Sequence, residues 1–69
     1  MFMKPKVAEI IKRRIDAGLS KRQLSISAGL GSSSICRIEN GITIAIHPLR
    51  AKAIAKALGC KVTDIFEKQ

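Results

Sequence analysis

The sequence predicts an all-α fold of five short helices in a single domain, residues 1–69. Three observations support this prediction. Apolar residues recur at intervals of three and four along most of the chain, which is the period of an amphipathic helix. Glycines and prolines divide these periodic segments into short lengths. The 69 residues suffice for one small domain and a small core.

The first helix is predicted at residues 5–17. Pro5 suits a first helical turn, where its missing N–H costs nothing, and Gly18 suits the C-terminal cap. Apolar residues at helical spacing form the expected buried face: Val7, Ile10, Ile11 and Ile15.

The second helix is predicted at residues 21–28 and the third at about residues 32–39. Ser20 and Gln23 have the spacing of a capping box at the start of the second helix. Gly29 and Gly31 interrupt the helical pattern between the two. Asn40 and Gly41 end the third helix, because both residues tolerate the left-handed conformation. The chain therefore contains two short helices joined by a glycine-containing turn.

The fourth helix is predicted at residues 48–58, opened by Pro48 and closed by Gly59. A last short helix is predicted at residues 62–66, with Val62, Ile65 and Phe66 available for the core. The segment "ITIAI" before the fourth helix alternates isoleucine with smaller residues, which is a strand-like period.

The charge balance indicates a polyanionic partner. Thirteen Lys and Arg against five Asp and Glu give a net charge of +8 and a pI near 10.2. Such a bias in so small a chain favours a nucleic acid or an anionic membrane as the partner. The chain has two Phe and no Trp or Tyr, which argues against folds that stack single-stranded bases on aromatic side chains.

Several classes of function are excluded by what the sequence lacks. Cys36 and Cys60 have no metal-ligand or redox-motif spacing, and His47 is the single histidine, so neither a metal nor a cofactor is expected. With no secretory signal, these residues are predicted to be free thiols in a cytoplasmic protein. No acid/base pair, nucleophile–base set or phosphate loop suggests an enzyme. No apolar run approaches the ~18 residues that span a bilayer.

Residues 20–40 have the helix-turn-helix arrangement, and their amino-acid sequence is more informative about the family than that pattern alone. The stretch "GLSKRQLSISAGLGSSSICRIENG" resembles the Cro/CI (Xre) family of phage and bacterial repressors, through Gln23, Leu24, Leu30 and the closing "RIENG". "IAKALGCKVTDIF" resembles the fourth and fifth helices of that family. The resemblance implies a five-helix lambda-repressor-like DNA-binding domain. Ser25 and Gly31 depart from the pattern, because many relatives have alanine and a serine N-cap there.

The resemblance implies that the third helix enters the major groove of double-stranded DNA as the recognition helix. Arg37 is the residue of this helix that can pair bidentately with guanine. Lys21 and Gln23 match family positions that contact DNA, whereas Arg22 is either a contact or a solvated charge. The expected DNA-contacting residues are Ser20, Lys21, Arg22, Gln23, Ser32, Ser33, Ser34, Arg37, Arg14 and Asn40.

Glu39 lies near the negative end of a helix dipole, where a carboxylate is unfavourable. In several family members an arginine near the end of the first helix pairs with this glutamate, and Arg14 occupies the matching position. The resemblance therefore implies an Arg14–Glu39 ion pair that joins the first helix to the third.

The expected function is a transcription regulator, in particular a repressor that binds a palindromic operator as a homodimer. The alternatives are an antitoxin or controller protein that represses its own operon, with a protein partner in the antitoxin case, and a basic amphipathic membrane binder. The glycines and prolines argue against the membrane binder, which needs one long helix. We expect the dimer interface among Ile42, Ile44, Ile46 and Phe66, although "ITIAI" folded back over the core is the other reading of that loop.

Overall fold

The computed structural model describes residues 1–68, which form five helices and two short strands. In chain order these are β1 (Met3–Pro5), α1 (Val7–Asp16), α2 (Lys21–Ser27), α3 (Ser34–Glu39), α4 (Pro48–Leu58), α5 (Val62–Ile65) and β2 (Phe66–Lys68). The five predicted helices are all present. The predicted bounds of α4 are correct, and those of α2 differ by one residue.

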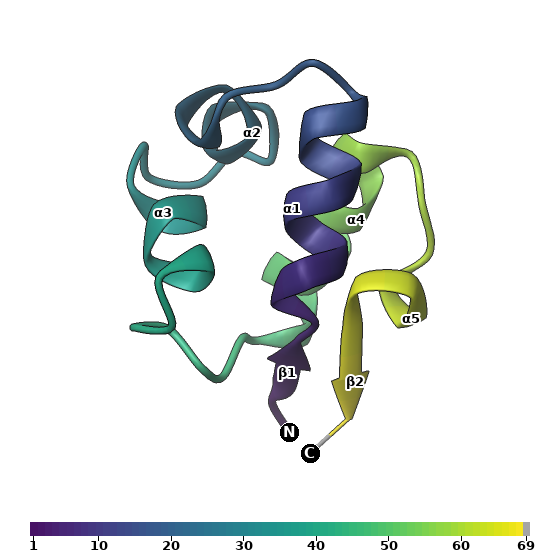
Figure 1. The fold of residues 1–69 in the computed structure, drawn as a ribbon. Coiled ribbons are helices and arrows are strands. Elements are labelled where there is room, and N and C mark those ends of the chain that lie inside the picture. The colour runs from purple at the N-terminus through teal and green to yellow at the C-terminus, as the bar shows by residue number, and fades with distance from the viewer. Residues whose placement is uncertain (69) are drawn as a thin grey trace.

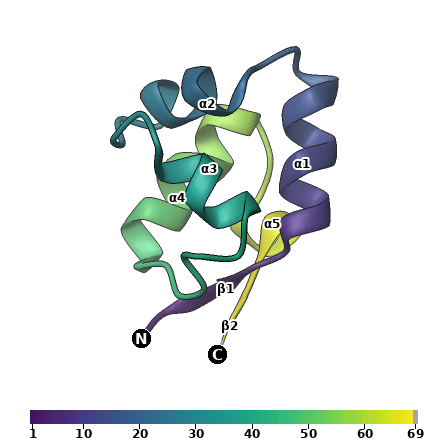
Figure 2. The ribbon, with the colours of Figure 1, turned by 60° about the vertical axis from the view of Figure 1, so that its left-hand side comes forward.

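The helices surround one core, with α1 in front of α4, α2 and α3 on one side of α1 and α5 on the other (Figure 1). Turning the molecule brings α3 forward and shows it below α2 and in front of α4 (Figure 2). Each helix contributes at least one fully buried apolar side chain, among them Ile10, Leu24, Ile35, Ile54 and Ile65. Burial of such a side chain is worth roughly 1.5–3 kcal/mol, so these contacts hold the helices together.

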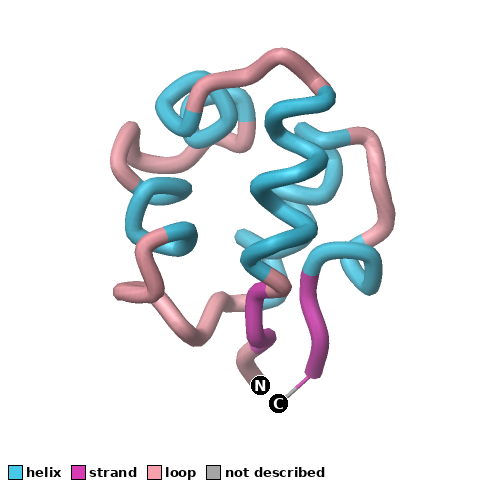
Figure 3. The backbone as a smooth tube through the Cα atoms, in the orientation of Figure 1, coloured by secondary structure: helices cyan, strands magenta, loops and turns pink. Residues whose placement is uncertain are grey.

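The sequence did not predict the small sheet. β1 pairs antiparallel with β2, with Met3 opposite Lys68 and Pro5 opposite Phe66, so the two ends of the chain lie side by side (Figure 3). Pro5 is therefore in a strand and not in the first turn of α1, and Phe66 starts β2 instead of ending α5. Three-residue strands are too short to show a period of two, and their partners lie at opposite ends of the sequence.

Two further expectations about the helices were wrong. Ile15 is 60 % exposed, because Arg14 turns toward α3 and the next residue, about 100° further round the helix, faces solvent. α3 begins at Ser34, since Ser32 and Ser33 form the turn that precedes it.

Two of the four residues expected in a dimer interface belong to the core of the single chain. Phe66 is fully buried and Ile46 is 4 % exposed. The backbone of Ile46 also exchanges hydrogen bonds of 2.8 and 2.9 Å with Met3. The end of "ITIAI" therefore folds back against β1, while Ile42 and Ile44 stay exposed at 71 % and 66 %. The intramolecular reading of this loop is correct for Ile46.

None of the helices described in residues 1–68 is long and apolar enough to cross a membrane.

Candidate nucleic-acid interface

The first turn of α2 is held by the capping box that the sequence predicts. The Ser20 hydroxyl accepts a hydrogen bond from the Gln23 N–H at 3.0 Å, and the Gln23 side-chain carbonyl accepts one from the Ser20 N–H at 2.8 Å. The amide NH₂ of Gln23 still has its two donors for another partner. Lys21 and Arg22 are exposed on the same turn. The four residues expected from α2 therefore lie together at one helix end.

Serine hydroxyls surround the start of α3. Ser32 and Ser33 are exposed in the turn, and Ser34 is half-buried in the first helical turn. Arg37 is exposed, four residues after Ser33, so it lies on the same side of the helix one turn further on. One buried hydroxyl, that of Ser25, bonds both the Lys21 carbonyl in the first turn of α2 and the Ile35 N–H in the first turn of α3, so the starts of the two helices lie close together.

Ser25 has a structural role that sequence reasoning missed. It is fully buried, and its hydroxyl donates to the Lys21 carbonyl at 2.8 Å and accepts from the Ile35 N–H at 3.0 Å. Ser33, the N-cap of α3, makes no side-chain capping bond. The Ser25 hydroxyl therefore caps α3 from the neighbouring helix. The signal available in the sequence was the serine itself, at a position where many relatives have alanine.

Arg14 and Glu39 form a bidentate ion pair between α1 and α3, as the resemblance implies. Arg14 Nε donates to Glu39 Oε2 at 2.7 Å, and Nη2 donates to Oε1 at 3.1 Å. The side chains are 12 % and 3 % exposed. Arg14 Nη1 also donates to the Leu19 carbonyl at 2.9 Å, which fixes the connection between α1 and α2. Most of the guanidinium is thus used inside the protein, and only a small edge of Arg14 remains for DNA.

The remaining candidate for DNA contact, Asn40, lies at the end of α3. Asn40 is exposed at the C-cap of α3, where its Nδ2 donates to the sulfur of Cys36 at 3.3 Å.

Both cysteines are free thiols. Burial raises the pKa of the Cys60 thiol, although the charge of Arg13 opposes that shift. The thiol of Cys60 is therefore protonated and a weak nucleophile near neutral pH.

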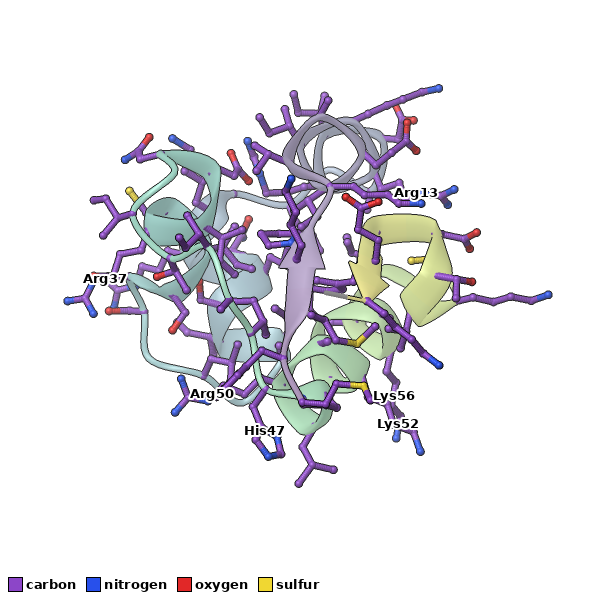
Figure 4. All side chains as sticks on the ribbon, turned by 90° about the horizontal axis from the view of Figure 1, so that it is seen from below. Arg13, Arg37, His47, Arg50, Lys52 and Lys56 are labelled. Atoms are coloured by element: carbon purple, nitrogen blue, oxygen red, sulfur yellow. The ribbon has the colours of Figure 1, made fainter. Side chains whose placement is uncertain are left out.

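Most of the positive charge lies on the surface without an acidic partner. Within residues 1–68 the structure contains two ion pairs, Arg13–Glu9 and Arg14–Glu39. No group of His, Cys, Asp or Glu in that range could hold a metal ion. Seen from the end where the termini lie, Arg37 and Arg50 project on the side of α3, whereas Lys52 and Lys56 project from another face of α4 (Figure 4).

Comparison with known proteins agrees with this geometry. Residues 10–65 match the family model HTH_3, described as helix-turn-helix. Among solved structures, the crystal structure of the restriction-modification controller protein C.AhdI from Aeromonas hydrophila is similar. The likeness has a TM-score of 0.76 at 22 % sequence identity and covers 84 % of this chain and 86 % of that chain, which supports the fold. No curated protein matches the chain.

Proposed function

The chain belongs to the Cro/CI (Xre) helix-turn-helix family and is a DNA-binding transcription regulator, and we propose that it is a repressor of a palindromic operator that it binds as a homodimer. This family consists of regulators and not of enzymes. One observation supports the proposal most directly. The exposed serines of the turn before α3 and Arg37 of α3 lie near the cationic first turn of α2, on a protein with a net charge of +8.

In the proposed complex, the start of α3 enters the major groove. Arg37 reads guanine through two parallel hydrogen bonds to O6 and N7. The hydroxyls of Ser32, Ser33 and Ser34 discriminate bases weakly, because a hydroxyl both donates and accepts.

The first turn of α2 lies along the DNA backbone in this arrangement. Lys21 and Arg22 neutralise phosphates, and Ser20 and Gln23 fix the register of the protein on the duplex. Arg14 and Asn40 are placed at the edge of the same contact, as supports for α3 more than as readers of sequence.

The proposed homodimer uses the exposed part of the loop after α3. Ile42 and Ile44 are the exposed isoleucines of this loop, and the segment of residues 40–49 contains no charged side chain. Two copies that each have a charge of +8 repel one another, so they meet most readily where no cation lies. A two-fold axis near this loop holds two recognition helices about one turn of DNA apart, ~34 Å.

Selection of bound sites from a random duplex library tests this function. The expected outcome is an enriched palindrome with two half-sites about one DNA turn apart, bound by two chains. Enrichment of a single half-site bound by one chain would leave a DNA-binding regulator but remove the homodimer. No enrichment over random duplex would remove sequence-specific repression.

A second candidate is a controller protein that regulates its own operon. The fold shared with the controller protein C.AhdI favours it. A reporter driven by the DNA upstream of the gene for this chain distinguishes the two candidates. Expression of the protein changes that reporter if the chain regulates its own operon, and leaves it unchanged if the operator lies elsewhere.

A further inference from the structure

A cavity of about 70 Å³ lies between α3, the loop that follows it and α4. Its floor consists of apolar core side chains, among them Ile38 and Ile54. Its polar and charged lining residues are Ser34, Thr43, Arg37 and Arg50. None of the lining residues is acidic. This space is several times the roughly 10–15 Å³ that one water needs on the same measure, so the cavity has room for a ligand larger than water.

We propose that this cavity binds one phosphate-type oxyanion between Arg37 and Arg50. Arginine keeps its charge at every physiological pH, and its planar set of N–H donors matches the oxygens of a phosphate. Within residues 1–68, neither arginine has an acidic partner, since the two ion pairs found there involve Arg13 and Arg14. Both side chains are exposed at the rim of the same cavity, and an anion between them attracts both cations.

The walls of the cavity are fixed before any ligand binds. The carbonyl of Arg37 accepts hydrogen bonds from the N–H groups of Ile42 at 2.9 Å and Thr43 at 3.1 Å, which holds Thr43 beside α3. The paired hydrogen bonds between Ile46 and Met3 fix the end of the loop. Arg50 lies in the first turn of α4, where the positive end of the helix dipole adds to the attraction for an anion. The backbone around the cavity is therefore ordered before the anion binds, and the ordering cost of binding is confined to the two arginine side chains.

A phosphate group that fits this site has two sources. One is a backbone phosphate of the bound duplex, which Arg37 and Arg50 can reach because both project on the side of α3 (Figure 4). This source rests on the proposed function. The other is free phosphate, which would act as a small-molecule ligand of the regulator. Arg37 has five N–H donors, so it can hold the anion along one edge and offer the other edge to a base.

Titration of the DNA-free protein with inorganic phosphate tests the free source. Chloride at matched ionic strength is the reference, and the amide resonances of Ser34, Thr43 and Arg50 are followed by NMR. The proposal expects saturable shifts in the wild type and in Lys52→Ala, and their loss in Arg50→Ala. Lys52 is the matched control, since it is an exposed cation on the same helix that points away from the cavity (Figure 4).

Duplex binding over a range of salt concentrations tests the DNA source. Arg50→Ala should make the slope of log affinity against log salt shallower by about 0.9, the value for one lost phosphate contact, and Lys52→Ala should leave it unchanged. A positive result in either arm supports the site and identifies its source. The proposal is overturned if both arms are negative, or if the two variants behave alike. In either case, duplex binding by both variants leaves the proposed function standing.

Discussion

The hydroxyl of Ser25 accepts a hydrogen bond from the backbone N–H of Ile35 at 3.0 Å and so joins the middle of α2 to the first turn of α3. Both residues are fully buried. The first N–H groups of a helix have no partner within the helix itself, and here the neighbouring helix supplies one. A single buried hydroxyl thus caps the start of α3 and ties it to α2.

Replacement of Ser25 by alanine should lower the free energy of unfolding by about 1–3 kcal/mol, because it leaves the Ile35 N–H buried without a partner. Urea denaturation measures the loss. Ser27→Ala is the control, as Ser27 is an exposed serine of the same helix with no hydrogen bond between its side chain and residues 1–68. Equal stability of the two variants would show that the bond contributes nothing.

The Arg14–Glu39 pair should dominate the contact between α1 and α3. Loss of one partner leaves the other charge buried, which costs ~3–5 kcal/mol in comparable sites. We expect Arg14→Ala and Glu39→Ala each to be strongly destabilising and the double variant to lose less than the sum. Thermal unfolding of the four proteins in a double-mutant cycle measures this. Strict additivity of the two changes would contradict a direct interaction.

Replacement of Arg37 and of Lys21 should change DNA affinity in different ways. Arg37→Ala should cost ~1–3 kcal/mol at the selected operator and far less on random duplex, because a lost guanine contact removes discrimination. Lys21→Ala should weaken both duplexes about equally, since a phosphate contact has no sequence preference. Gel-shift titrations of both proteins on both duplexes decide the matter. The reverse pattern would exchange the roles of the two residues.

Ile44→Lys should give a folded monomer with much weaker operator binding. Ile44 is 66 % exposed, so a lysine there does not disturb the core but places a charge in the proposed interface. Sedimentation velocity reports the oligomeric state. Ile15→Lys serves as the control, because Ile15 is 60 % exposed and lies on α1, outside the uncharged segment of residues 40–49. A dimeric Ile44→Lys variant would exclude this loop as the interface.

Local signals explain which helices could be predicted. The ends of α2 and α4 are set by residues close in sequence. The Ser20–Gln23 capping box starts α2, and Pro48 starts and Gly59 ends α4. Met3 and Phe66 gave no such signal for a sheet, because the partner of each lies at the other end of the chain.

The candidate site divides in the same way. The exposed cations and serines of α2 and α3 were visible in the sequence, together with their order along the chain. The Arg14–Glu39 pair joins residues 25 positions apart, and the family resemblance supplied it where periodicity could not. The Ser25–Ile35 bond was missed because the sequence does not show whether a serine hydroxyl faces solvent or a neighbouring backbone amide. Arg50 escaped notice because its cavity exists only after α3 and α4 have packed.

The pairing of β1 with β2 gives the molecule a property of its own. With Pro5 opposite Phe66, the two ends of the chain meet, and the polypeptide between them forms one nearly closed ring. In the unfolded chain these ends are far apart on average. Folding must bring them together, and the loss of conformational entropy on closing this loop grows only slowly with the number of residues between them. A backbone cyclised through a short linker would remove much of that cost in advance without disturbing α2 or α3. The domain is therefore suited to head-to-tail cyclisation as a route to higher stability.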